Sequence, residues 1–331
     1  MDKGVIYRDL NTGTPTGQLP DGRYTYARNP NGAPASANTA NWNKNPSFGN
    51  VILLTNTDKG SSDNFTVSLK KPFNGNWSGM VAYTYSRAKD VNPGTSSVAF
   101  SSYQNNAWYN PGEDVASTSN YSIPNRIIAS LSWEHKFFGD YATRVSAFYG
   151  GHTGAPYSWV FGNDAQGLGI SGRSLAYVPN RGDIVWANTA SAAMAESFWS
   201  YIDNSTDLAG AQGSVAPRNA SRAGWVNQLD MSFSQEIPGF MKAHKAEIRL
   251  DMFNVLNMID KKWGVERRAD FPLTRRLANM FGVTADGKYI YDISGTDYNV
   301  NGTYSPKDLA VNESQSPSQR WSILATLRYT F

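Results

Sequence analysis

The last twelve residues, RWSILATLRYTF (320–331), decide the fold class. One side of an extended strand would carry Trp321, Ile323, Ala325, Leu327, Tyr329 and Phe331. The other side would carry polar and charged residues, and only Leu324 breaks the alternation. A half-buried strand of a soluble sheet alternates in the same way, so this pattern alone does not determine the environment of the strand.

The two ends of the apolar stripe are more specific. Trp321 lies at one end, Tyr329 and Phe331 lie at the other, and aliphatic residues lie between them. The segment also has roughly the ten residues that a tilted strand needs to cross a bilayer. An aromatic residue at each membrane interface is typical of strands in outer-membrane barrels.

Six further segments repeat this alternation of apolar and polar residues. They are DNFTVSLKK (63–71), NWSGMVAYTYS (76–86), NRIIASLSWEHKF (125–137), YATRVSAFYG (141–150), WVNQLDMSFSQE (225–236) and KAEIRLDMFNVLN (245–257). Short turns near residues 74–76, 139–140 and 238–239 alternate with long connections, roughly 88–123, 153–224 and 258–317. Such long loops are rare in compact soluble domains but are expected on the extracellular side of a barrel. The sequence therefore predicts an all-β fold, an antiparallel transmembrane β-barrel with long extracellular loops.

Composition excludes several other classes of protein. No segment approaches the ~18 continuous apolar residues of a transmembrane helix, which excludes a helical membrane protein. The absence of cysteine excludes disulfides and thiolate metal sites. A net charge of +3 is mild and the basic pairs are scattered, so we expect no nucleic-acid partner.

Some segments depart from the strand pattern. VIYRDL (5–10) and NVILLTN (50–56) look like two strands that pair in a ladder above the membrane. Within the long connections, SAAMAESFWSYID (191–203) and DFPLTRRLANMFG (270–282) have the signals of two helices. We expect these helices to pack the loops over the mouth of the barrel.

Three segments resemble a known family. The terminal RWSILATLRYTF, DMFNVLNMIDKKWG (251–264) and NFTVSLKKPFNGNWSGMVAYTYSRAKD (64–90) look like the C-terminal barrel of TonB-dependent outer-membrane receptors, closest to the Oar-like group. The similarity covers residues 63–331. It implies a 22-stranded barrel in the outer membrane of a Gram-negative bacterium, with an N-terminal plug domain and a TonB-type energy transducer as partner.

This chain shows about eight to ten strands by length, and neither a plug domain nor a signal peptide. We therefore expect the C-terminal part of a larger barrel that lacks its plug. Residues 1–62 would supply N-terminal strands and a loop, and residues 63–331 the barrel strands with their extracellular loops.

Some segments match catalytic or metal-binding motifs, but the residues around them do not fit such a site. GLGISG (167–172) spells G-x-G-x-x-G without a βαβ unit, and Ser68 and Lys71 match S-x-x-K within a strand. The three histidines, His135, His152 and His244, are isolated in the sequence. We expect no catalytic, cofactor or metal site, and we expect that the protein is not an enzyme.

Binding is better supported than catalysis, because the long loops are rich in aromatic residues. The candidate contacts to an unidentified extracellular ligand are Trp108, Tyr109, Trp159, Trp186 and Trp199. For any one of these rings, packing between loops is the alternative. A basic group, Arg267, Arg268, Arg275 and Arg276, is a candidate for binding lipopolysaccharide phosphates or an anionic ligand.

The expected function is TonB-dependent uptake of a ligand across the outer membrane. A structural or adhesive barrel and a passive porin are the alternatives. Outer-membrane lipid, lipopolysaccharide and the barrel-assembly machinery are further expected partners. In the family that the chain resembles, that machinery reads a terminal aromatic signal, which here is Trp321, Tyr329 and Phe331.

Replacing Phe331 with Asp should abolish insertion, because the change removes the terminal aromatic ring and places a charge at the apolar end of the last strand. Fractionation of inner and outer membranes, followed by immunoblotting, measures this. Normal insertion of the Phe331→Asp variant would refute the assembly role.

Overall fold

The structure is a computed structural model of the chain, and it describes residues 4–26, 43–187, 190–241, 244–311 and 319–331. Among these residues, no helix is both long and apolar enough to cross a membrane.

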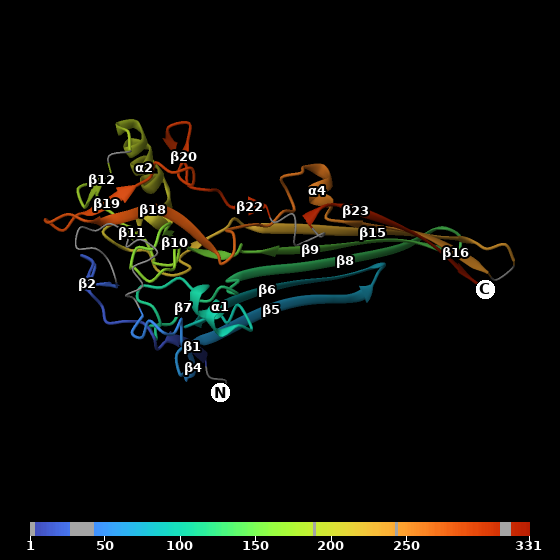
Figure 1. Cartoon of the computed structure of the whole chain (residues 1–331). Coiled ribbons are helices and arrows are strands. Elements are labelled where there is room, and N and C mark those ends of the chain that lie inside the picture. The colour runs from blue at the N-terminus through green and yellow to red at the C-terminus, as the bar shows by residue number, and fades with distance from the viewer. Residues whose placement is uncertain (1–3, 27–42, 188–189, 242–243, 312–318) are drawn as a thin grey trace.

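The main feature is one antiparallel sheet of seven long strands, in the order β23-β16-β15-β9-β8-β6-β5. Figure 1 shows these strands running side by side, with the short turns and Phe331 at one end and the long connections at the other. All seven predicted strands are confirmed. Their bounds are β5 Ser61–Asn74, β6 Trp77–Asp90, β8 Asn125–Phe138, β9 Tyr141–His152, β15 Val226–Pro238, β16 Lys245–Phe253 and β23 Ser322–Thr330.

The register of the sheet brings the apolar stripes of successive strands onto one face. One row across five strands consists of Leu131, Ala147, Met231, Met252 and Ile323. The next row points to the opposite face and consists of Ser132, Ser146, Ser232, Asp251 and Leu324. Large residues on the apolar face are exposed, for example Leu327 at 74%. In a membrane barrel, lipid covers such a face and the polar face lines the lumen.

The residue that broke the alternation, Leu324, stays in register. It pairs with Asp251 on the lumenal face, so the strand carries an apolar residue there without a bulge.

The sheet has two open edges. Within the described residues, β5 and β23 each have one neighbour in this sheet, apart from a two-residue strand, β7 (Ser117–Thr118), on β6. Both edge strands run toward the end with the short turns. A closed barrel in which all neighbours are antiparallel therefore needs an odd number of further strands between them. Without such strands, backbone groups at both edges would lie unpaired in lipid, at several kcal/mol each.

The N-terminal strands form a separate ladder. β1 (Gly4–Asp9) pairs antiparallel with β4 (Ile52–Thr57), as expected from the sequence. These two strands pair with each other and not with the barrel sheet, which consists of the seven long strands and the two-residue β7. Another short hairpin nearby consists of β2 (Gly17–Gln18) and β3 (Tyr24–Thr25).

The second and third long connections fold together into one extracellular domain. Its mixed sheet has the order β12-β19-β18-β10-β14, in which β10 pairs parallel with β18, and β12 with β19. Strands β10, β12 and β14 come from residues 153–225, and β18 and β19 from residues 254–321. The bounds are β10 Pro156–Phe161, β12 Ile184–Trp186, β14 Ser221–Arg222, β18 Thr274–Val283 and β19 Tyr289–Asp292. The two connections therefore depend on each other for their pairing.

A hydrophobic core fills this domain. Phe198 and Ile202 of α2 (Ala192–Asn204) pack in one buried cluster with Phe161, Leu277 and Tyr291. Ser191 caps the helix by accepting a hydrogen bond from the Met194 amide. The remaining short elements are α1 Ala99–Gln104, α3 Thr206–Ala209, α4 Val255–Ile259, β11 Tyr177–Val178, β13 Ser214–Val215, β17 Arg267–Arg268, β20 Asn299–Val300, β21 Thr303–Tyr304 and β22 Ala310–Val311.

Of the two predicted loop helices, one is confirmed and one is wrong. SAAMAESFWSYID forms α2, but DFPLTRRLANMFG is mostly β18. Residues such as Leu, Arg, Ala and Met favour helices locally. Here, pairing on both sides with β10 and β19 decides the conformation, and it buries Leu277 and Met280 in the domain core.

The two faces of the sheet predict opposite responses to a new charge. Phe233→Arg places a guanidinium on the lipid face and should lower the free energy of unfolding by about 2–4 kcal/mol, if Phe233 lies near the bilayer midplane. Ser232→Arg places the same group beside Asp251 on the lumenal face and should have little effect. Urea titration in outer-membrane vesicles measures both. Equal destabilisation by the two variants would contradict this assignment of faces.

Candidate functional site

Most of the candidate loop aromatics are buried. Trp108, Trp159 and Trp199 are 3%, 2% and 7% exposed, and Trp186 packs edge-to-face on Phe198 at a centroid distance of 5.2 Å. Trp159 and Trp199 belong to the core of the extracellular domain, and the Trp108 indole donates a hydrogen bond to Gln166. These tryptophans pack one loop against another. Ligand contact therefore remains a prediction mainly for Tyr109 and Trp186, which are partly exposed.

The predicted basic group does not act as a unit. The guanidinium of Arg275 is buried against the Trp159 ring, 4.6 Å from its centroid, and donates to the Lys307 carbonyl. Arg276 pairs with Asp297, whereas Arg267 and Arg268 lie on β17, which pairs with β22. The cation–π contact of Arg275 joins the second and third connections and explains its burial.

The GLGISG segment forms a tight loop around a carboxylate. Asp164 accepts hydrogen bonds from the backbone amides of Gly167, Leu168 and Gly169. Gly167, Gly169 and Gly172 all have positive φ angles, which glycine adopts without strain. The amides that could receive a phosphate are thus already bonded within the loop.

The partly exposed Tyr109 lines a large cavity between the connections. This cavity has a volume of about 610 Å³ and is lined by Tyr109, Tyr177, Tyr289, Asp21 and Asp183, among others. We call it the tyrosine–aspartate cavity. Its volume lies within the range of small-molecule sites, roughly 300–1,000 Å³.

Three tight turns surround this cavity, and each places an aspartate next to a glycine. They are Asp21-Gly22, Gly182-Asp183 and Asp286-Gly287, and all three glycines have positive φ angles. Asp-Gly turns of this kind are visible in the sequence, which is the signal that could have indicated these residues. Their convergence could not be foreseen, because one turn lies in the N-terminal segment before β5 and the other two lie in the second and third long connections.

Hydrogen-bond donors and acceptors are fixed in place at the cavity wall. The rings of Tyr177 and Tyr289 stack at a centroid distance of 4.9 Å, and the Tyr177 hydroxyl donates to Asp183 over 2.8 Å. Burial, and then this contact with Asp183, raise the pKa of Tyr177 to about 12. Tyr177 therefore stays protonated at neutral pH and keeps the Asp183 carboxylate oriented. Arg23, which is fully buried, pairs with Asp21 at 2.5 Å.

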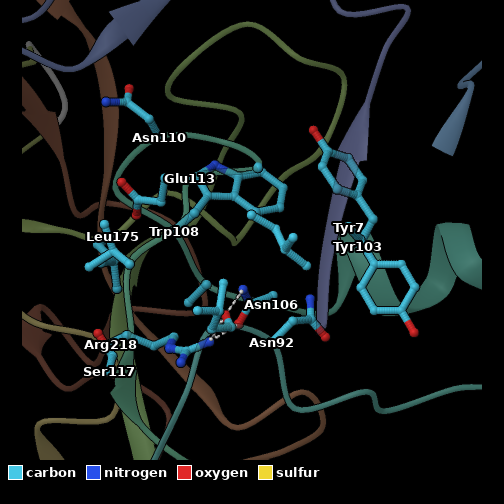
Figure 2. Close-up of a pocket in the computed structure, with 15 residues that line it drawn as sticks. Tyr7, Asn92, Tyr103, Asn106, Trp108, Asn110, Glu113, Ser117, Leu175 and Arg218 are labelled. Carbon is cyan, nitrogen blue, oxygen red and sulfur yellow. Dashed lines mark hydrogen bonds between the residues drawn. The ribbon is translucent and has the colours of Figure 1, made fainter. Parts of the chain in front are cut away.

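A second, much smaller cavity of about 40 Å³ lies where β1 meets the connections (Figure 2). Arg218 donates to Asn106 and to the Val91 carbonyl there, and forms an ion pair with Asp90 at 2.8 Å. These contacts tie the 153–225 connection to the end of β6. The space suits one or two water molecules, so this is a structural joint between loops.

The residues of the expected assembly signal lie along the outer face of β23. The Tyr329 hydroxyl accepts a hydrogen bond from the Phe240 amide, and the two rings stack at 5.7 Å. Phe331 is 94% exposed, and Trp321 lies exposed at the opposite end of the strand. Their role in assembly remains a prediction.

Glu113 in the small cavity predicts a pH effect on loop stability. Burial raises the pKa of this carboxyl above its ordinary value of 4.5. The folded state then holds the proton more tightly than the unfolded state, so stability falls as pH rises from about 4.5 through the folded pKa. Glu113→Gln should therefore stabilise the loops at neutral pH, and the gain should vanish near pH 4.5. Urea unfolding followed by tryptophan fluorescence measures this.

A lower stability of the Glu113→Gln variant at neutral pH would contradict the prediction. Glu196→Gln is a suitable control, because Glu196 is exposed on α2.

Comparison with known proteins agrees with this architecture. A family model described as an outer membrane beta barrel domain matches residues 4–260, more than half of the chain. No curated protein and no solved structure gives a significant match. The matched region contains six of the seven long strands and the first two long connections. The chain therefore belongs to the outer membrane beta barrel domain family, and its long strands form part of an outer-membrane barrel.

Proposed function

We propose that this protein is a receptor that takes up a ligand across the outer membrane of a Gram-negative bacterium, and that a TonB-type transducer supplies the energy. The observation that carries the proposal is the tyrosine–aspartate cavity, which lies in a packed extracellular domain at the end of a sheet with a polar lumenal face. A binding site outside the membrane and a polar path through it are the two parts that an uptake receptor needs.

The extracellular domain favours a receptor over a passive porin. Its core joins the second and third connections through buried pairing and the contact of Arg275 with Trp159. Such packing costs conformational entropy, and a pore for passive diffusion does not require it. It also holds the cavity wall in place, which lowers the entropy cost of binding a ligand.

The ligand would meet rings and fixed hydrogen-bonding groups in this cavity. Tyrosine presents an apolar ring with a polar tip, and Asp183 has a carboxylate already oriented by Tyr177 and Asn180. The resemblance of the sequence to TonB-dependent receptors supports the energy source and the need for a plug domain. The outer-membrane lipid, lipopolysaccharide and the assembly machinery would be the remaining partners.

The test compares strains that carry the wild-type gene, a deletion, and Asp183→Asn. Mass spectrometry of the growth medium measures which small molecules each strain removes, with and without a protonophore that collapses the proton gradient. We expect at least one compound whose removal needs both the gene and the gradient. Asp183→Asn should slow its removal about tenfold, since a hydrogen bond to a charged group contributes about 1.5–3 kcal/mol.

The other candidate functions give different results. Gene-dependent removal that survives the protonophore would indicate a passive porin. The absence of any gene-dependent removal would contradict uptake and leave the structural or adhesive barrel. Asp140→Asn is the matched control, because Asp140 lies in the exposed short turn between β8 and β9 and does not line the cavity.

A further inference from the structure

A cavity distinct from the tyrosine–aspartate cavity lies at the other end of β18. It has a volume of about 350 Å³ and is lined by residues that include Ser171, Arg173, Arg276 and Lys307. We call it the arginine cavity. Tyr289 of the first cavity pairs with Val283, so the two cavities are separated by about seven residues of β18, or roughly 23 Å.

The charges around the arginine cavity do not balance. Its lining contains four cations, Arg173, Arg275, Arg276 and Lys307, and three carboxylates, Asp270, Asp297 and Asp308. Each carboxylate has its own cation. Asp297 pairs with Arg276, Asp270 pairs with Lys307 at 2.6 Å, and Asp308 lies 3.6 Å from Arg275. One positive charge therefore has no counterpart.

That charge belongs to Arg173. Its Nε and Nη1 donate to the backbone carbonyls of Gln104 and Gly172, and it forms no ion pair with any carboxylate in the part of the chain that the structure describes. These two bonds hold the guanidinium in a fixed position at the cavity wall. Burial, and then the nearby charge of Arg276, lower the pKa of Arg173. Two guanidinium groups thus share one partly enclosed space, at an electrostatic cost.

We propose that the arginine cavity binds a phosphate group, held between Arg173 and Arg276 with Lys307 as a further cation. A phosphate ester carries about −1.5 to −2 charges and three acceptor oxygens, so it can neutralise the excess charge and accept from several donors at once. The planar guanidinium suits such bidentate contacts. The side-chain hydroxyl of Ser171 at the rim adds a neutral donor.

Of the four arginines in the basic group predicted from the sequence, only Arg276 is proposed to bind the phosphate. Arg275 is committed to the aromatic rings of Tyr157 and Trp159, and Arg267 and Arg268 do not line the cavity. The partner of Arg276 in this site is Arg173, which lies about a hundred residues earlier in the chain. The phosphate site does not depend on uptake and could serve attachment to lipopolysaccharide or recognition of a free phosphorylated ligand.

Equilibrium dialysis tests the proposal, with the purified full-length protein in detergent and radiolabelled pyrophosphate as the probe. We expect saturable binding to the wild-type protein at millimolar or lower concentration. Arg173→Gln and Arg276→Gln should each weaken binding at least about tenfold, because a charged hydrogen bond contributes about 1.5–3 kcal/mol. Arg267→Gln changes the charge by the same amount on a strand outside the cavity and should bind as the wild type does.

Two outcomes would overturn the phosphate site. One is the absence of saturable binding to the wild-type protein, and the other is unchanged binding in the Arg173→Gln variant. Chymotrypsin digestion of each variant without pyrophosphate reports whether the extracellular domain is folded. Because Arg173→Gln also loses hydrogen bonds to the Gln104 and Gly172 carbonyls, its binding is judged only if the variant resists digestion as well as the wild type does. If Arg173→Gln is digested faster than the wild type, Lys307→Gln is tested in its place, because Lys307 is exposed at the rim of the cavity. Unchanged binding in Lys307→Gln would also overturn the site.

Competition identifies the source of the phosphate. Displacement of pyrophosphate by purified lipopolysaccharide, but not by the same material after enzymatic dephosphorylation, would assign the site to lipopolysaccharide. Displacement by neither would assign it to a free phosphorylated compound.

Discussion

The pairing of every backbone amide and carbonyl within the membrane is the constraint on which the rest of this structure depends. No water is present in the bilayer core to replace a missing hydrogen bond, so strands there must be long, regular and in register. The ladder from β5 to β23 meets this requirement across six interfaces. Because the register is kept along most of each ladder, most apolar residues of the seven strands lie on one face and most polar residues on the other, with Ile128, Phe148 and Leu324 among the exceptions.

The same constraint also determines at which end of the sheet the long, irregular connections occur. Strands joined by short turns at one end leave all the variable chain length for the other end, and nearly all of the irregular structure is found there. The connections gain stability by packing on each other, since they have no lipid to bury their apolar residues in. Phe198, Leu277 and Tyr291, which come from separate parts of the chain, fill one core. Loops fixed in this way can hold cavities with defined walls, which isolated mobile loops cannot do.

Electrostatics then divides the extracellular domain into two regions of different character. Asp21, Asp183, Asp286, Lys288 and stacked tyrosines line one cavity, so carboxylates exceed cations there, whereas the other has four cations and three carboxylates. Arg23 and Arg275 are buried among aromatic rings in the same domain, and their charges are offset by carboxylates or carbonyl groups. These buried arginines stabilise the packing. Arg173 differs from them because its neighbour in the cavity is another guanidinium.

The amino-acid sequence by itself determined the seven strands, their apolar face, the alternation of short turns and long connections, and helix α2. The strands and α2 follow from periods of about two and about 3.6 residues, and the turns from local Gly, Pro, Asn and Asp residues, so nearby residues specify each of them. Only the tertiary structure decided that DFPLTRRLANMFG becomes a strand, that most candidate tryptophans are buried, and that Tyr109 meets Asp21 and Asp183 at one cavity. Those outcomes depend on pairing between connections about a hundred residues apart, such as Trp159 with Arg275. A local pattern does not show which distant segment a strand will pair with. That pairing determines which side chains are buried and which remain exposed.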